Sequence, residues 1–130
     1  MSGEINLRKL LKEMRPVLNS GGYVFCITDS LDNAAALDPI GIFKEEESVT
    51  VILPKEKADE NNLSYSVICA WITLNVHSSL EAVGLTAAVS KALTEAEISC
   101  NVVAAYYHDH IFVPVKDGGR AMDVLLSLTR

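Results

Sequence analysis

Two short segments each lie at the N-terminus of a predicted helix: His77-Ser78-Ser79 and Asp117-Gly118-Gly119. The free backbone N–H groups at a helix N-terminus can hold a carboxylate, and the helix dipole favours negative charge there. The carboxylate of Asp117 could hold an ammonium group, and the glycine pair would let a ligand approach the backbone closely. These are the groups that an α-amino acid needs. In a second interpretation, Ser78 and Asp117 only cap their own helices and the glycine pair is a plain turn.

A second pair of polar residues, Ser99 and Asn101, lies in the predicted strand 98–105. The two share one face, and at a sheet edge they could line a pocket shared with another copy of the fold. The alternative is a half-solvated edge face. The segment His108-Asp109-His110 has residue types that bind metals. We nevertheless predict no metal site, because we expect this hairpin tip and His77 at opposite edges of the sheet.

Motifs of common catalytic sites are missing from the sequence, which contains no GxSxG, Walker, GxGxxG, HExxH or CxxC pattern. Cys26, Cys69 and Cys100 lie in apolar segments typical of strands, where a thiol is inert. Their odd number and wide spacing indicate reduced cysteines, not a disulfide framework or a zinc site. We therefore predict a protein that is not an enzyme and needs no cofactor.

The elements that must position these residues follow a β-α-β-β-α pattern in the second half of the chain. The pattern predicts a strand over 65–76, a helix over 78–97, strands over 98–107 and 110–115, and a final helix capped by Asp117. This is the ferredoxin-like order without its last strand, with the sheet order 4-1-3-2. We expect the strands 65–76 and 110–115 to lie side by side and parallel, so that the loops after them meet.

In the first half of the chain, the pattern predicts a helix over 6–15 that ends at Pro16, a turn at 20–22, and strands over 23–28, 40–44 and 49–53. The strand 65–76 has an open neighbour position in the ferredoxin-like order. A long apolar edge is an aggregation site, so we expect the first half to fill that position. The mixed face around Trp71, the only tryptophan, indicates partial cover by another domain or subunit.

Composition narrows the class of protein. The chain has 130 residues and a formal net charge of −6, which makes nucleic acid an unfavourable partner. A hydrophobic share of 49% with 22% charged residues supports a folded core. No apolar run approaches the ~20 residues that span a bilayer, and the N-terminus lacks the pattern of a signal peptide. We expect a cytoplasmic protein with no membrane partner.

Two segments carry a resemblance to a known family: 71–86 (WITLNVHSSLEAVGLT) and 98–114 (ISCNVVAAYYHDHIFVP). They resemble a signature of small bacterial proteins with two ACT domains in tandem. The resemblance implies an α+β fold, with a ferredoxin-like βαββαβ ACT architecture in two interlocked halves, residues 1–62 and 63–130. Many ACT domains place a glycine in the loop before the first helix, whereas here the nearest glycine, Gly84, falls inside the predicted helix.

The resemblance also implies a function. ACT domains bind an amino acid or a similar small effector at an interface between ACT units, and the resemblance implies no reaction. We therefore expect a regulatory protein that forms a homodimer or a larger homo-oligomer. Its expected ligand-binding residues are those named above: His77, Ser78, Ser79, Asp117, Gly118, Gly119, Ser99 and Asn101. The alternative is a protein–protein interaction module that binds a partner through the Trp71 face or a sheet edge and has no small ligand.

Overall fold

The computed structural model describes residues 3–75 and 84–130. Its contacts divide the chain into two compact units, which we call the C-terminal unit (residues 1–20 and 70–130) and the N-terminal unit (residues 21–69). The strands are hydrogen-bonded in the order β2-β3-β1-β4-β6-β5. Strand β1 (Arg15–Thr28) contributes its first residues to one unit and its last residues to the other. The two halves of the chain are therefore interlocked, while the predicted boundary between residues 62 and 63 stays a prediction.

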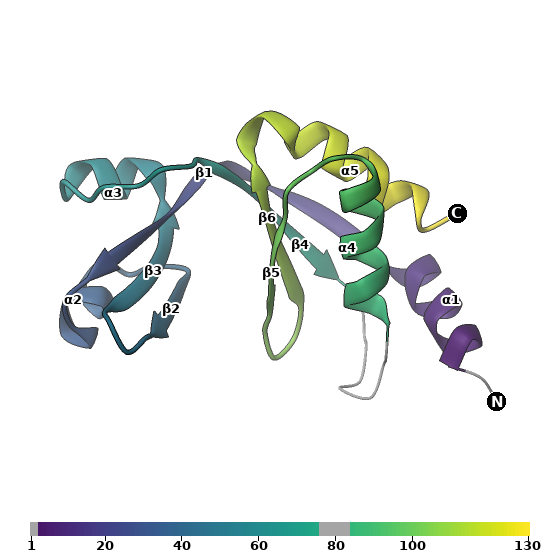
Figure 1. Ribbon diagram of the computed structural model, residues 1–130, viewed down its shortest axis with the longest axis horizontal. Coiled ribbons are helices and arrows are strands. Elements are labelled where there is room, and N and C mark those ends of the chain that lie inside the picture. Colours follow the sequence, from purple (N-terminus) through teal and green to yellow (C-terminus); the bar gives the residue numbers. More distant parts are fainter. Residues whose placement is uncertain (1–2, 76–83) are drawn as a thin grey trace. The chain divides into compact units, whose positions relative to one another are not determined.

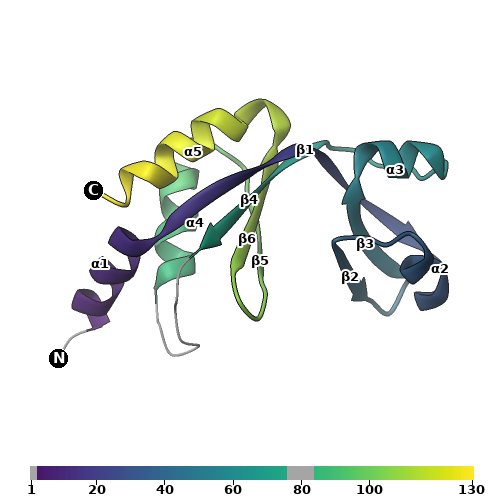
Figure 2. The ribbon, with the colours of Figure 1, turned by 180° about the vertical axis from the view of Figure 1, so that it is seen from behind.

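The C-terminal unit follows the predicted β-α-β-β-α order (Figure 1). Its elements are β4 (Cys69–Asn75), α4 (Leu85–Glu95), β5 (Asn101–Ala104), β6 (Asp109–Pro114), the 3-10 turn η1 (Val115–Asp117) and α5 (Gly118–Ser127). Helix α1 (Gly3–Glu13) and the start of β1 come before them in the chain. Strand β1 is the neighbour of β4, as Figure 2 also shows, so the first half fills the open position as expected.

The N-terminal unit has the same order with shorter helices. Its elements after β1 are α2 (Leu31–Ala36), β2 (Gly41–Lys44), β3 (Val49–Pro54) and α3 (Lys55–Glu60). Strand β3 pairs antiparallel with β1 from Tyr23↔Pro54 to Thr28↔Val49, and β2 pairs antiparallel with β3. The side chain of Ser30 accepts a hydrogen bond from the backbone N–H of Asn33 and so caps α2.

Strand β1 is longer than the sequence predicts, and the expected turn at 20–22 lies inside it. Gly21 has a φ of 95°, a left-handed conformation that a glycine adopts without steric cost. Gly22 packs closely against Ile68, because a Cβ built on it would lie 2.8 Å from the Ile68 Cγ2 atom. The two glycines thus allow a bend and a close approach within one strand, not a chain reversal.

Each unit has its own hydrophobic core. In the C-terminal unit, the even positions of β4 face helices α4 and α5, as predicted. Its core residues are Met14, Ala70, Ile72, Leu74, Leu85, Val89, Leu93, Ile98, Ile111, Val113, Ala121 and Leu125. The core of the N-terminal unit is smaller and comprises Val24, Cys26, Ala34, Val49, Val51, Leu53 and Ala58. Within the described ranges, no helix is long and apolar enough to cross a membrane.

Helix α4 begins at Leu85, later than the sequence predicts. Gly84 is its N-cap, with a φ of 99°, so Gly84 lies before the helix and not inside it. The expected cap, Ser78, lies outside the described residues. At the other end, the Ile98 N–H donates to the Leu93 carbonyl at 2.9 Å and the Glu97 N–H to the Thr94 carbonyl at 2.9 Å. These bonds end α4 in a Schellman turn and direct the chain toward β5.

Candidate functional site

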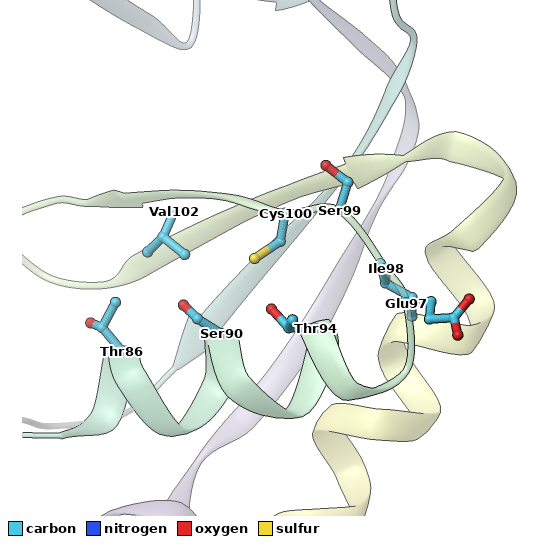
Figure 3. Close-up of a pocket in the computed structure, with 8 residues that line it drawn as sticks. All are labelled: Thr86, Ser90, Thr94, Glu97, Ile98, Ser99, Cys100 and Val102. Carbon is cyan, nitrogen blue, oxygen red and sulfur yellow. The ribbon is translucent and has the colours of Figure 1, made fainter.

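A groove of about 560 Å³ lies between helix α4 and strand β5 (Figure 3). Its lining residues are Thr86, Ser90, Thr94, Glu97, Ile98, Ser99, Cys100 and Val102. Sites for small ligands have volumes of about 300–1,000 Å³, so the groove has the size of a small-molecule site. Strand β5 is the last strand of the sheet order, and the groove therefore lies at a sheet edge.

A row of hydroxyl groups forms one wall of the groove. Thr86, Ser90 and Thr94 are spaced four residues apart, which places them on one face of α4. Figure 3 shows all three pointing toward β5, where Cys100 and Val102 point back at them. A hydroxyl donates one hydrogen bond and accepts others, so this wall can bind a carboxylate, an ammonium group or an amide.

The groove presents no charged side chain to the hydroxyl row among its lining residues. The carboxylate of Glu97 points away from that row in Figure 3. Burial raises the pKa of the Cys100 thiol, and a hydrogen bond with the Ser90 side chain lowers it by a smaller amount. The thiol is therefore protonated at neutral pH and is a poor nucleophile. This chemistry suits reversible binding of a small polar molecule better than covalent catalysis.

Of the two ligand-binding residues predicted in the strand 98–105, the structure places one at the groove and the other away from it. Ser99 lines the groove, although its side chain points away from α4 in Figure 3. Asn101 pairs with Phe112 across β5 and β6 and does not line the groove. Cys100 packs against the core and also forms part of the groove.

The predicted meeting of two loops rests on parallel strands, and that expectation is wrong. The first residues of β4 lie beside the end of β6, since a Cβ on Gly118 would lie 3.2 Å from the Ala70 Cβ. The later residue Thr73 instead contacts His110, near the start of β6. Strands β4 and β6 are therefore antiparallel, and Asn75 and Asp117 lie at opposite ends of the sheet. His77, Ser78 and Ser79 themselves lie outside the described residues.

The second predicted segment has structural contacts of its own. Asp117 precedes α5 without a side-chain capping bond, and its carboxylate lies 3.4 Å from the Arg120 guanidinium. Arg120 also donates to the Ala96 carbonyl at 3.3 Å. Gly118 is buried, and a Cβ built on it would lie 3.2 Å from the Ala70 Cβ, while its role in ligand binding stays a prediction. Gly119 has open space where a Cβ would lie.

The hairpin segment His108-Asp109-His110 lies near the last residues of β4, because those strands are antiparallel. This corrects the expectation that the hairpin tip and the end of β4 lie at opposite edges. Among the described residues, no group of three or more His, Cys, Asp or Glu side chains could hold a metal ion. His110 instead contacts Trp71 and Thr73 of β4.

Sequence reasoning missed the hydroxyl row of α4. The apolar residues Leu85, Val89 and Leu93 identify the buried face of this helix, and Thr86, Ser90 and Thr94 each follow one of them directly. The four-residue spacing of the hydroxyls was visible in the sequence. This spacing indicates a polar wall only if the polar residues of a helix are tested for periodicity in the same way as the apolar residues.

Comparison with family models gives two matches. Residues 2–70 match one ACT domain model and residues 66–127 match another. No curated protein matches the sequence significantly.

Solved structures give the same architecture. A Vibrio cholerae protein of unknown function, described as a possible transport protein, is 45% identical with a TM-score of 0.91, and the match covers 99% of this chain and 100% of that one. The regulatory subunit of aspartate kinase from Thermus thermophilus is 10% identical with a TM-score of 0.60, covering 88% and 97% of the two chains. Aspartate kinase from Clostridium acetobutylicum is 9% identical with a TM-score of 0.67, covering 90% of this chain and 34% of that one. The chain therefore belongs to the ACT-domain family and contains two ACT domains in tandem.

Proposed function

We propose that this protein is a non-catalytic regulatory protein that binds an amino acid or a similar small effector in the groove between α4 and β5. The single observation that carries the proposal is the row of three hydroxyls on α4, which faces Cys100 and Val102 across a space of ligand size. The fold supports it, because the structures that share this fold include the regulatory subunit of aspartate kinase from Thermus thermophilus.

The groove suits the two ends of an amino acid. Gly84 has no side chain with which to cap α4, and backbone N–H groups in the first turn of a helix, here beside Thr86, are groups that can hold a carboxylate. The hydroxyls of Ser90 and Thr94 can accept hydrogen bonds from an ammonium group. The predicted ligand residues His77, Ser78 and Ser79 precede α4 in the sequence, and their role stays a proposal, as does that of Asp117, Gly119 and Asn101.

We also propose that a second ACT unit completes the site. The groove opens at the sheet edge formed by β5, whose short strand has four residues. An exposed strand edge is a surface on which another chain can pair. In this arrangement the ligand stabilises the assembly it bridges, because it binds the assembled state more tightly than the separate chains.

A panel of the twenty common amino acids in a thermal-shift assay tests the proposal. A ligand at 100 times its dissociation constant adds about 2.7 kcal/mol to the free energy of unfolding. Ser90→Leu, which fills the groove, should abolish the shift. The matched control is Ala36→Leu, which fills a groove of the N-terminal unit and should leave the shift intact.

Two outcomes would contradict the proposal: no shift with any amino acid, or an unchanged shift in Ser90→Leu. The first outcome favours the interaction module. A specific observation supports that second candidate, because Trp71 is only partly buried on the sheet face opposite the core.

A further inference from the structure

A hydrogen-bonded cluster crosses three strands of the C-terminal unit on the sheet face opposite α4 and α5. The Asn19 Nδ2 atom of β1 donates to the Trp71 carbonyl at 3.2 Å and to the Thr73 Oγ1 atom at 3.0 Å. The Trp71 Nε1–H donates to the His110 Nδ1 atom at 3.0 Å, and Thr73 Oγ1 lies 3.3 Å from the same nitrogen. The cluster therefore converges on one ring nitrogen of His110.

This geometry fixes the protonation state of His110. An indole N–H is a donor only, so the His110 Nδ1 atom must be an acceptor and carries no proton. The ring is then neutral, with its proton on Nε2. Protonation of Nδ1 would set two donors against each other at 3.0 Å. Thr73 can reverse its role, because a hydroxyl also accepts, whereas Trp71 has no such alternative.

We propose that Trp71 and His110 form a proton-operated latch, in which neutral His110 holds the indole against β6 and protonated His110 releases it. The indole lies between two residues of β6, with its ring centroid 5.8 Å from that of His110 and 6.4 Å from that of Phe112. Loss of this hydrogen bond removes one contact that orients the indole, so acidification changes the surface that this sheet face presents.

The surroundings of His110 set the direction in which its pKa is shifted. Burial lowers the pKa of His110 below 6.5, and the nearby His108 lowers it further, while Asp109 raises it. Among the described residues, these two hairpin residues are the titratable groups that act on the pKa of His110. The packed strands contribute Trp71 and Thr73 from β4 and Val103 from β5, none of which titrates near neutral pH.

Trp71 is the only tryptophan of the chain, so its fluorescence reports on the latch directly. Between pH 8 and pH 5 the full-length protein should show one transition, with a midpoint below 6.5, a red shift of the emission and increased quenching by acrylamide. His110→Asn removes titration but keeps an acceptor close to the Nδ1 position, and it should abolish the transition.

The matched control is His108→Asn. The Nδ1 atom of His108 is buried and makes no hydrogen bond among the described residues. This variant should keep the transition and move its midpoint to higher pH, because the electrostatic effect by which His108 lowers the pKa of His110 is removed. A transition that persists in His110→Asn, or that disappears in His108→Asn, would overturn the proposal.

A second measurement needs no variant and uses the unmodified protein. Nitrogen NMR of the imidazole rings in the unmodified protein at pH 8 should show His110 with a protonated Nε2 and an unprotonated Nδ1. A proton on Nδ1 at that pH would refute the latch, as would a fluorescence signal that does not change while the same spectra show His110 becoming protonated.

Discussion

The two ACT domains have the same order of elements but differ in what surrounds their sheets. The N-terminal unit has two helices of six residues and seven core residues. Among the described residues of the C-terminal unit, α4 and α5 have eleven and ten residues and lie over twelve core residues. The longer α4 has room for a buried face and, beside it, a row of hydroxyls that borders the groove. The comparison teaches that the order of elements defines the fold, whereas the longer first helix of the C-terminal unit adds a row of hydroxyls beside its buried face.

Truncation of a core leucine in each unit tests this difference with the largest expected effect. Leu93 and Leu53 are both fully buried. Leu93→Ala and Leu53→Ala should each reduce the free energy of unfolding by about 2–5 kcal/mol, because a cavity replaces packed atoms. Leu93→Ala should have the larger effect, because Leu93 lies in the larger core between the longer helices, where the surroundings collapse less easily. Urea unfolding of both variants measures the difference, and a larger loss in Leu53→Ala would reverse our ranking of the two cores.

Two glycines should respond to alanine with opposite signs. Gly22→Ala should lower stability by about 1–3 kcal/mol, because its Cβ would lie 2.8 Å from the stiff side chain of Ile68. Gly119→Ala in α5 should raise stability by about 0.5–1 kcal/mol, because it meets nothing within 4 Å and alanine favours a helix. The same urea assay decides both signs. Stabilisation by Gly22→Ala would show that β1 does not need the close approach to Ile68.

The two units should also lose stability at different pH values. The lowered pKa of His110 means that its contribution is complete above pH 6.5 and declines as the pH falls toward the folded-state value. In the N-terminal unit, hydrogen bonds from Lys55 and Tyr65 lower the pKa of Asp59 below 3.8, so its contribution declines only in stronger acid. Unfolding of His110→Asn and Asp59→Asn from pH 8 to pH 3 measures both.

The Asp59 effect should be the smaller one and should weaken in salt, since the Lys55–Asp59 pair is exposed. Equal stability losses of wild type and His110→Asn between pH 7 and pH 5 would contradict the assignment of the near-neutral response to His110.

Much of this fold could be predicted from the sequence because apolar periodicity reports burial directly. The even positions of β4 and the hairpin of β5 and β6 are examples. The prediction that β4 and β6 are parallel was wrong for a topological reason. The helix α4 joins β4 to β5 as a parallel pair, and β6 between them must then be antiparallel to β4. The prediction of a turn at Gly21 and Gly22 was wrong because glycine permits a bend within a strand as well as a chain reversal.

The candidate site was harder to predict from the sequence than the fold. Ser99 was identified because a polar residue in an apolar strand attracts notice. Thr86, Ser90 and Thr94 were missed because polar residues on a helix are common on solvated faces and acquire meaning only when a neighbouring strand leaves a space beside them. No local pattern specifies that space, since it depends on the separation of α4 and β5 in the folded chain.

The most direct test of the central claim is NMR mapping of amino-acid binding on isotope-labelled protein. Each common amino acid is added in turn, and backbone amide shifts are followed residue by residue. Our account predicts that one amino acid perturbs a contiguous set of amides along the groove, at Thr86, Ser90, Thr94 and Cys100. Perturbations confined to the N-terminal unit, around Asn33 and Asn61, or no perturbation by any amino acid, would contradict it.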